Sequence, residues 1–112
     1  MKRTNRNSLI ALGLVASLAL PGLAMAYYSL GRKEESEAAL AEFVENYQAF
    51  GAYNVAQAYA FCGEVDRAFQ WLQKAYVQHD GGMFLVMVDP LLKNLKPDPR
   101  YKDLLKKMNL PV

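Results

Sequence analysis

The chain has 112 residues, which is enough for one small domain with a single hydrophobic core. Hydrophobic residues make up 53% of it and charged residues 21%, as in a folded helical protein that also carries one very apolar segment. Three of its 13 basic residues lie in the first 26 positions, so the rest of the chain has ten basic and 11 acidic side chains. This balance of charge excludes a basic face for nucleic acid. The single cysteine excludes an intrachain disulfide.

The N-terminal segment has the pattern of a targeting or membrane signal. A basic start precedes an apolar run over residues 9–20, and Ala24-Met25-Ala26 matches the small-residue pattern that signal peptidase recognises. Residues 9–30 also carry no charge over 22 positions, which is long enough to cross a bilayer. Residues 1–26 are therefore a cleaved signal peptide, a membrane anchor or a buried helix. The first two predict a periplasmic, secreted or membrane-anchored protein, and the third a cytoplasmic one.

Residues 34–47 predict a helix. Apolar side chains recur there at the spacing of one helix face, namely Leu40, Phe43, Val44 and Tyr47. Three glutamates crowd the first turn, where the helix dipole favours negative charge. We therefore expect a solvated acidic helix start there, with no acid–base role for the glutamates.

Residues 52–79 predict two further amphipathic helices joined by a tight turn at Cys62-Gly63-Glu64. Each helix has an apolar stripe at i, i+3, i+4 and i+7, comprising Ala52, Val55, Ala56 and Tyr59 in the first and Val65, Ala68, Phe69 and Leu72 in the second. Gly63 stands where the end of a helix needs a residue that adopts positive φ. Such a hairpin cannot bury both of its faces alone, so a second copy is expected.

A shift of 32 residues supplies that copy, because it aligns residues 20–47 with residues 52–79. At the aligned positions, small residues match small residues, and tyrosine, turn glycine and leucine each match an identical residue. The pairs are Ala24 with Ala56, Tyr27 with Tyr59, Gly31 with Gly63, Ser36 with Ala68, and Leu40 with Leu72. Small residues let neighbouring helices approach closely, while larger ones fill the gaps. The sequence therefore predicts two helix–turn–helix repeats, the first of which overlaps the N-terminal signal.

Residues 83–112 predict a truncated third repeat and a C-terminal capping helix. The apolar run at 83–88 suits a short helix or a strand by pattern alone, and beside the hairpins we interpret it as a truncated helix. Asp89-Pro90 and Asp98-Pro99 each place an N-cap residue before a proline, which is a strong helix-start signal. The second step opens an amphipathic helix over 99–108 that would close the end of the array.

The repeat resembles the tetratricopeptide repeat (TPR), whose usual period is about 34 residues. Leu30-Gly31, a tyrosine four residues before each turn glycine, Ala68 and Ala75 carry the resemblance. Ser36 and Phe43 depart from it, because small alanines are usual at both positions. The resemblance implies an all-α, TPR-like α-α superhelix of about two repeats with a capping helix.

The C-terminal part adds a second resemblance. The motifs D-R-A-F-x-W-L, V-D-P-L-L and D-P-R-Y…L-L-K-K-M resemble the C-terminal repeats of bacterial regulators, where such repeats commonly follow a cyclase, kinase or winged-helix domain. No such domain is present in this sequence, so the activities of those domains do not carry over.

The reactive side chains form no catalytic pattern. His79 is the only histidine, and Cys62 has no neighbouring histidine or lysine in its helix end. The sequence also lacks a glycine-rich phosphate loop, a nucleophile elbow and metal-ligand spacing. We therefore predict a protein that is not an enzyme and that needs no cofactor or metal.

The TPR resemblance implies a concave groove, lined by the first helix of each repeat, that takes an extended peptide or a partner helix. Carrying the groove positions over to this sequence selects seven residues: Met25, Tyr28, Ser29, Tyr53, Gln57, Ala60 and Phe61. The carboxylate-clamp form of the groove has Lys and Asn where this chain has Tyr53 and Gln57. An apolar or aromatic-anchored ligand is therefore expected in place of an acidic C-terminal peptide.

These observations predict a non-catalytic protein–protein interaction module, a TPR scaffold or adaptor, with an unidentified protein or peptide as partner. Two alternatives stay open: a small membrane-anchored structural subunit that contacts the bilayer through residues 9–30, or a detached C-terminal sensor piece of a larger TPR-containing regulator. Two repeats and a cap are near the minimum for a stable array. Self-association through the open N-terminal edge is therefore also expected.

Overall fold

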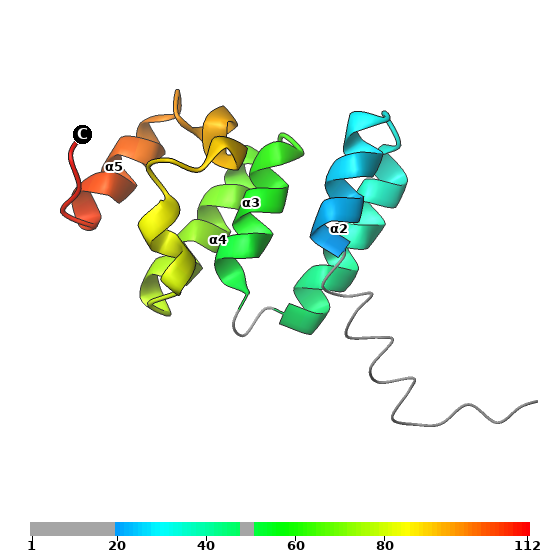
Figure 1. The fold of residues 1–112 in the computed structure, drawn as a ribbon, viewed down its shortest axis with the longest axis horizontal. Coiled ribbons are helices and arrows are strands. Elements are labelled where there is room, and N and C mark those ends of the chain that lie inside the picture. The colour runs from blue at the N-terminus through cyan, green and yellow to red at the C-terminus, as the bar shows by residue number, and fades with distance from the viewer. Residues whose placement is uncertain (1–19, 48–50) are drawn as a thin grey trace, which may run out of the picture.

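The computed structural model describes residues 20–47 and 51–112 (Figure 1). All regular structure within these residues is helical, which confirms the all-α prediction. A helix over 20–29 is followed by α2 (Lys33–Tyr47), α3 (Ala52–Phe61), α4 (Val65–Val77), the 3-10 helices η1 (Gly81–Leu85) and η2 (Pro90–Leu95), and α5 (Pro99–Lys107).

The predictions for the N-terminal signal fall largely on residues 1–19, which lie outside the described residues. Residues 20–26 belong to the helix over 20–29, where the first repeat was predicted to begin. In the part of the chain that the structure describes, no helix is both long enough and apolar enough to cross a membrane.

The helices stand in a row of three layers (Figure 1). The first hairpin comprises the helix over 20–29 and α2, and the second comprises α3 and α4. The C-terminal layer comprises η1, η2 and α5. Helix α2 packs on α3, η2 packs on α3, and both η1 and α5 pack on α4, so the second hairpin is covered from both sides.

The turns of the two hairpins lie 32 residues apart and have the same backbone conformation and hydrogen bonding, which we call the backbone frame. Gly31 and Gly63 both adopt the left-handed conformation with φ of 77°. After each glycine, the next amide donates to the carbonyl oxygen four residues before the glycine, over 2.9 Å in both turns: Arg32 to Tyr27, and Glu64 to Tyr59. This is the hydrogen bond of a glycine-terminated helix, and it confirms the turn positions predicted from the sequence.

Substituting alanine for each turn glycine tests this frame. A left-handed residue with a side chain costs about 1–2 kcal/mol, and at position 31 an added Cβ would meet nothing within 4 Å. At position 63 the Cβ would lie 3.1 Å from the Tyr28 hydroxyl. In urea denaturation we expect Gly63→Ala to lose more stability than Gly31→Ala. Equal losses would contradict a fixed Tyr28 ring against the second turn.

The core contains most members of the predicted apolar stripes, while Val44 and Val65 are half-buried and the side chain of Tyr47 lies outside the described residues. Small residues are fully buried where helices approach, as at Ala24 and Ala56, and the larger members of the stripes fill the space between them. Ser36 is also buried, and its hydroxyl donates to the Ala24 carbonyl oxygen at 2.7 Å. The departure from alanine at this position is therefore accommodated, because the serine hydroxyl finds a partner on the neighbouring helix.

In the C-terminal layer, η2 and α5 begin at the positions that the two Asp-Pro steps predicted. The Asp89 carboxylate accepts a hydrogen bond from the Leu91 amide at 2.9 Å, and the Asp98 carboxylate accepts one from the Arg100 amide at 3.0 Å. The apolar run at 83–88 is shorter than a repeat helix, because η1 ends at Leu85 and a turn follows.

Candidate functional site

The predicted groove residues divide into an open group and a covered group. On the helix over 20–29, Met25 and Tyr28 are half-buried and Ser29 is exposed. On α3, Phe61 is half-buried, but Tyr53 is only 2% exposed and Ala60 is completely buried. Gln57 is half-buried.

The chain's own C-terminal layer covers the α3 part of the expected groove. The Asp89 carboxylate accepts hydrogen bonds from the Tyr53 hydroxyl at 2.7 Å and from the Gln57 side-chain amide at 2.5 Å. The Asn94 side-chain amide donates to the Ala60 carbonyl oxygen at 3.0 Å. Tyr53, Gln57 and Ala60 therefore bind an internal segment in this structure, which corrects the expectation of an open surface at these three positions.

The hydrogen bonds around Asp89 fix its charge state. Burial alone would raise the pKa of the Asp89 carboxyl, but the donors from Tyr53, Gln57 and the Leu91 amide outweigh that effect and hold the pKa below its usual value. Burial, followed by the hydrogen bond to Asp89, raises the pKa of the Tyr53 hydroxyl far above its usual value. Asp89 is therefore a carboxylate and Tyr53 a neutral donor at physiological pH.

The uncovered groove residues gather where the two hairpins meet. The Tyr28 and Phe61 rings pack edge to face, with centroids 6.2 Å apart and planes at 70°. Met25 and Ser29 lie three residues before and one residue after Tyr28, and the Ser29 hydroxyl donates to the Met25 carbonyl oxygen at 3.0 Å. We call Met25, Tyr28, Ser29 and Phe61 the aromatic ledge. It is the part of the predicted groove that remains accessible.

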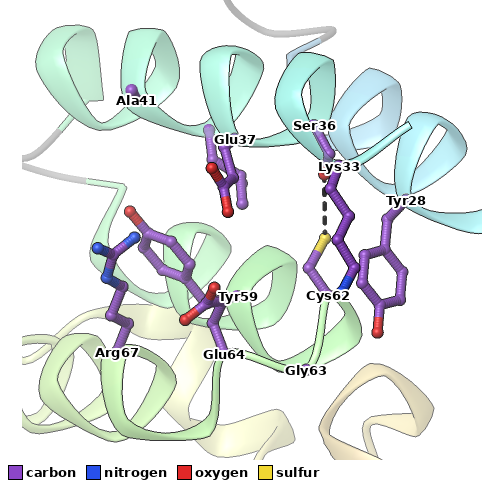
Figure 2. A pocket seen from close by; sticks show the side chains of 11 residues that line it. Tyr28, Lys33, Ser36, Glu37, Ala41, Tyr59, Cys62, Gly63, Glu64 and Arg67 are labelled. Carbon is purple, nitrogen blue, oxygen red and sulfur yellow. Dashed lines mark hydrogen bonds between the residues drawn. The ribbon is translucent and has the colours of Figure 1, made fainter. Parts of the chain in front are cut away.

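A cleft of about 240 Å³ adjoins the ledge between α2 and the second hairpin (Figure 2). Its walls carry two basic and two acidic side chains: Lys33 and Glu37 from α2, and Glu64 and Arg67 from the second hairpin. The Tyr59 ring lies between the two walls, with the Arg67 guanidinium 5.7 Å from its centroid. Tyr28 lines the cleft as well, so the cleft and the ledge are continuous.

The inner wall of the cleft is closed by Ser36 and Cys62, whose side-chain oxygen and sulfur lie 3.6 Å apart (Figure 2). Burial raises the pKa of the Cys62 thiol, and the contact with Ser36 opposes that effect only in part. Because the thiolate is the nucleophilic form, this cysteine is a packed apolar group with low reactivity. The charged side chains on the walls of the cleft can bind polar and charged groups of a ligand by ion pairing and hydrogen bonding.

Sequence reasoning missed this cleft. It placed Glu37 in a solvated helix start and gave Lys33 and Arg67 no role. The available signal was that charged residues of both signs follow each turn glycine, at the starts of the predicted second helices. Only the stacking of one hairpin on the other brings the two sets together.

Over residues 20–47 and 51–112, no three His, Cys, Asp or Glu side chains are grouped so that they could hold a metal ion. Comparison of the chain with protein-family models, curated proteins and solved structures found no match.

Proposed function

We propose that the protein is a non-catalytic protein–protein interaction module built from two TPR-like repeats. The observation that carries the proposal is the backbone frame that recurs after 32 residues, with the same glycine conformation and the same hydrogen bond in both turns. Helical hairpins that repeat in this way stack into arrays whose surfaces bind extended segments of other proteins.

The proposed binding surface is the aromatic ledge together with the adjoining cleft. Aromatic side chains at the ledge supply apolar contact area, and rigid aromatic groups are frequent anchors at protein interfaces. The cleft offers charges of both signs beside Tyr28. The preferred partner is therefore a peptide or helix with an apolar or aromatic anchor for the ledge and a neighbouring polar or charged side chain for the cleft.

The covered part of the groove limits the length of that partner. Because Asp89 occupies the hydrogen-bonding groups of Tyr53 and Gln57, the partner has only the junction of the two hairpins to contact. We expect it to use a short segment, without a run of anchors along the whole array.

A photo-reactive amino acid at position 29 tests this surface in cells that produce the protein natively. Ser29 is exposed, so the substitution leaves the core unchanged. We expect a discrete cross-linked product at position 29 and a large loss of it when Phe61→Ala is added. Position 70, an exposed site on α4, serves as the matched control and should not give this product.

Two results would contradict the proposed surface. One is the same cross-linked product from positions 29 and 70, and the other is an undiminished product with Phe61→Ala. A thermal melt of the Phe61→Ala protein must show the folded state at the labelling temperature, so that loss of the product reports on the ledge.

A further inference from the structure

The helix over residues 20–29 contains Ala24-Met25-Ala26, the pattern that signal peptidase recognises. Hydrolysis of the peptide bond after Ala26 would release residues 20–26 together with everything before them. In the structure this stretch is part of the first hairpin and contributes to its core, since Leu20 is 7% exposed and Ala24 is completely buried. Cleavage at the pattern would therefore remove core residues of the fold.

Hydrogen bonds hold the helix in place on both sides of this bond. Before it, the Ala24 carbonyl oxygen accepts from the buried Ser36 hydroxyl of α2 at 2.7 Å. Across it, the Leu30 amide donates to the carbonyl oxygens of Ala26 and Tyr27, at 3.1 Å to each. A protease needs the bond in an open segment, so it acts on the population in which these contacts are broken. The folded hairpin therefore protects the bond, and losing Ala24 would take the acceptor away from a buried hydroxyl.

The corresponding residues of the second hairpin indicate that this stretch is a repeat helix. The shift of 32 residues that aligns the two repeats places it on α3. Ala24 then corresponds to Ala56 and Leu20 to Ala52, and all four side chains are at most 7% exposed. In helical repeats the second helix of each pair packs on the first, as α4 packs on α3 here. Helix α2 therefore needs the residues before Tyr27 as part of its own first helix.

We propose that residues 20–26 remain in the folded protein as part of the first helix of the first repeat, and that the bond after Ala26 is not a processing site. The small residues of the pattern then have another origin, since Ala24 lets the helices of the hairpin approach closely. The aromatic ledge would lose Met25 if the bond were cut. The inference nevertheless rests on the packing of the hairpin, and it holds whether or not the ledge binds a partner.

Trypsin digestion of the protein from cells that produce it natively tests the proposal. Trypsin cuts after Arg6 and Arg32, so a chain that keeps the helix yields a peptide that begins at or before Leu20 and ends at Arg32. A chain cut after the alanine pattern yields residues 27–32 instead, which begin with Tyr27. Calibrated with labelled synthetic peptides, mass spectrometry should find the first kind of peptide to be the more abundant. A protein whose more abundant N-terminus lies after Leu20 would overturn the proposal.

Leu40→Ala tests whether the hairpin itself protects the bond. Leu40 is 2% exposed on α2, so its loss should open the first hairpin more often while leaving the alanine pattern unchanged. With the purified full chain and a protease that cuts after alanine, we expect cleavage after Ala26 to be faster than in the parent by about tenfold or more. Leu92→Ala makes the same change at a buried site of the C-terminal layer and should have a clearly smaller effect. Equal cleavage rates in Leu40→Ala and the parent would mean that the fold does not protect this bond, which would overturn the proposal.

Discussion

Replacing Leu92 with alanine will lower the free energy of unfolding by about 2–5 kcal/mol, the usual effect of emptying a fully buried leucine site. Leu92 is completely buried in η2, which packs on α3. Chemical denaturation of the purified chain measures the loss. Val88→Ala is the matched control, because Val88 belongs to the same layer but is 72% exposed, and we expect a change within about 0.5 kcal/mol.

This result decides whether the C-terminal layer is core or a displaceable ligand of α3. As core, it unfolds together with the second hairpin, and Leu92→Ala shifts one cooperative transition. A separate early transition, in which the layer leaves and the Trp71 signal of α4 stays native, would show that the layer is a detachable segment occupying the groove.

Asp89→Ala will lower the free energy of unfolding by about 3 kcal/mol, because it leaves the buried Tyr53 hydroxyl and the Gln57 amide without their acceptor and removes an N-cap. Asp98→Ala removes the same kind of cap in the same Asp-Pro context, but on an exposed site, and we expect a clearly smaller loss. Equal losses in thermal unfolding would show that the contacts with Tyr53 and Gln57 add nothing beyond capping.

The same carboxylate makes stability depend on pH. Because the pKa of Asp89 is lower in the folded chain, its contribution is complete above the unfolded pKa of about 3.9 and is lost as the pH falls through the folded value. Asp89→Asn cannot titrate. Its unfolding free energy, measured against pH in the acid range, should therefore fall less steeply than that of the parent. Parallel curves for the two proteins would contradict this assignment.

The helices and turns were predictable because their signals are local. Gly31 and Gly63 mark positions that require positive φ, and the two Asp-Pro steps combine an N-cap with a residue suited to the first turn of a helix. The spacing of small and large apolar residues likewise identified the buried faces, because a helix face repeats every three to four residues. Each of these signals depends on neighbours close in sequence.

The candidate site was less predictable because it depends on residues far apart in sequence. Asp89 and Asp98 have the same local context, but only Asp89 reaches a buried tyrosine, 36 residues earlier in the chain. Tyr53 and Gln57 were predicted to face a partner, and they face Asp89 instead. Similarly, periodicity identified 83–88 as apolar, but only the packing of Met83 and Val86 shows that Phe84 and Val88 point outward.

The position of α3 in the middle layer has a consequence for local opening. It is covered by α2 on one side and by η2 on the other, and most of its side chains are buried. Among the residues that the structure describes, the first hairpin has a neighbouring layer on one side only, with a cleft in that contact. Amide hydrogens of α2 should therefore exchange with solvent through partial opening, while those of α3 exchange only when the whole chain unfolds. The slowest amides of α3 would thus report the global stability of the protein.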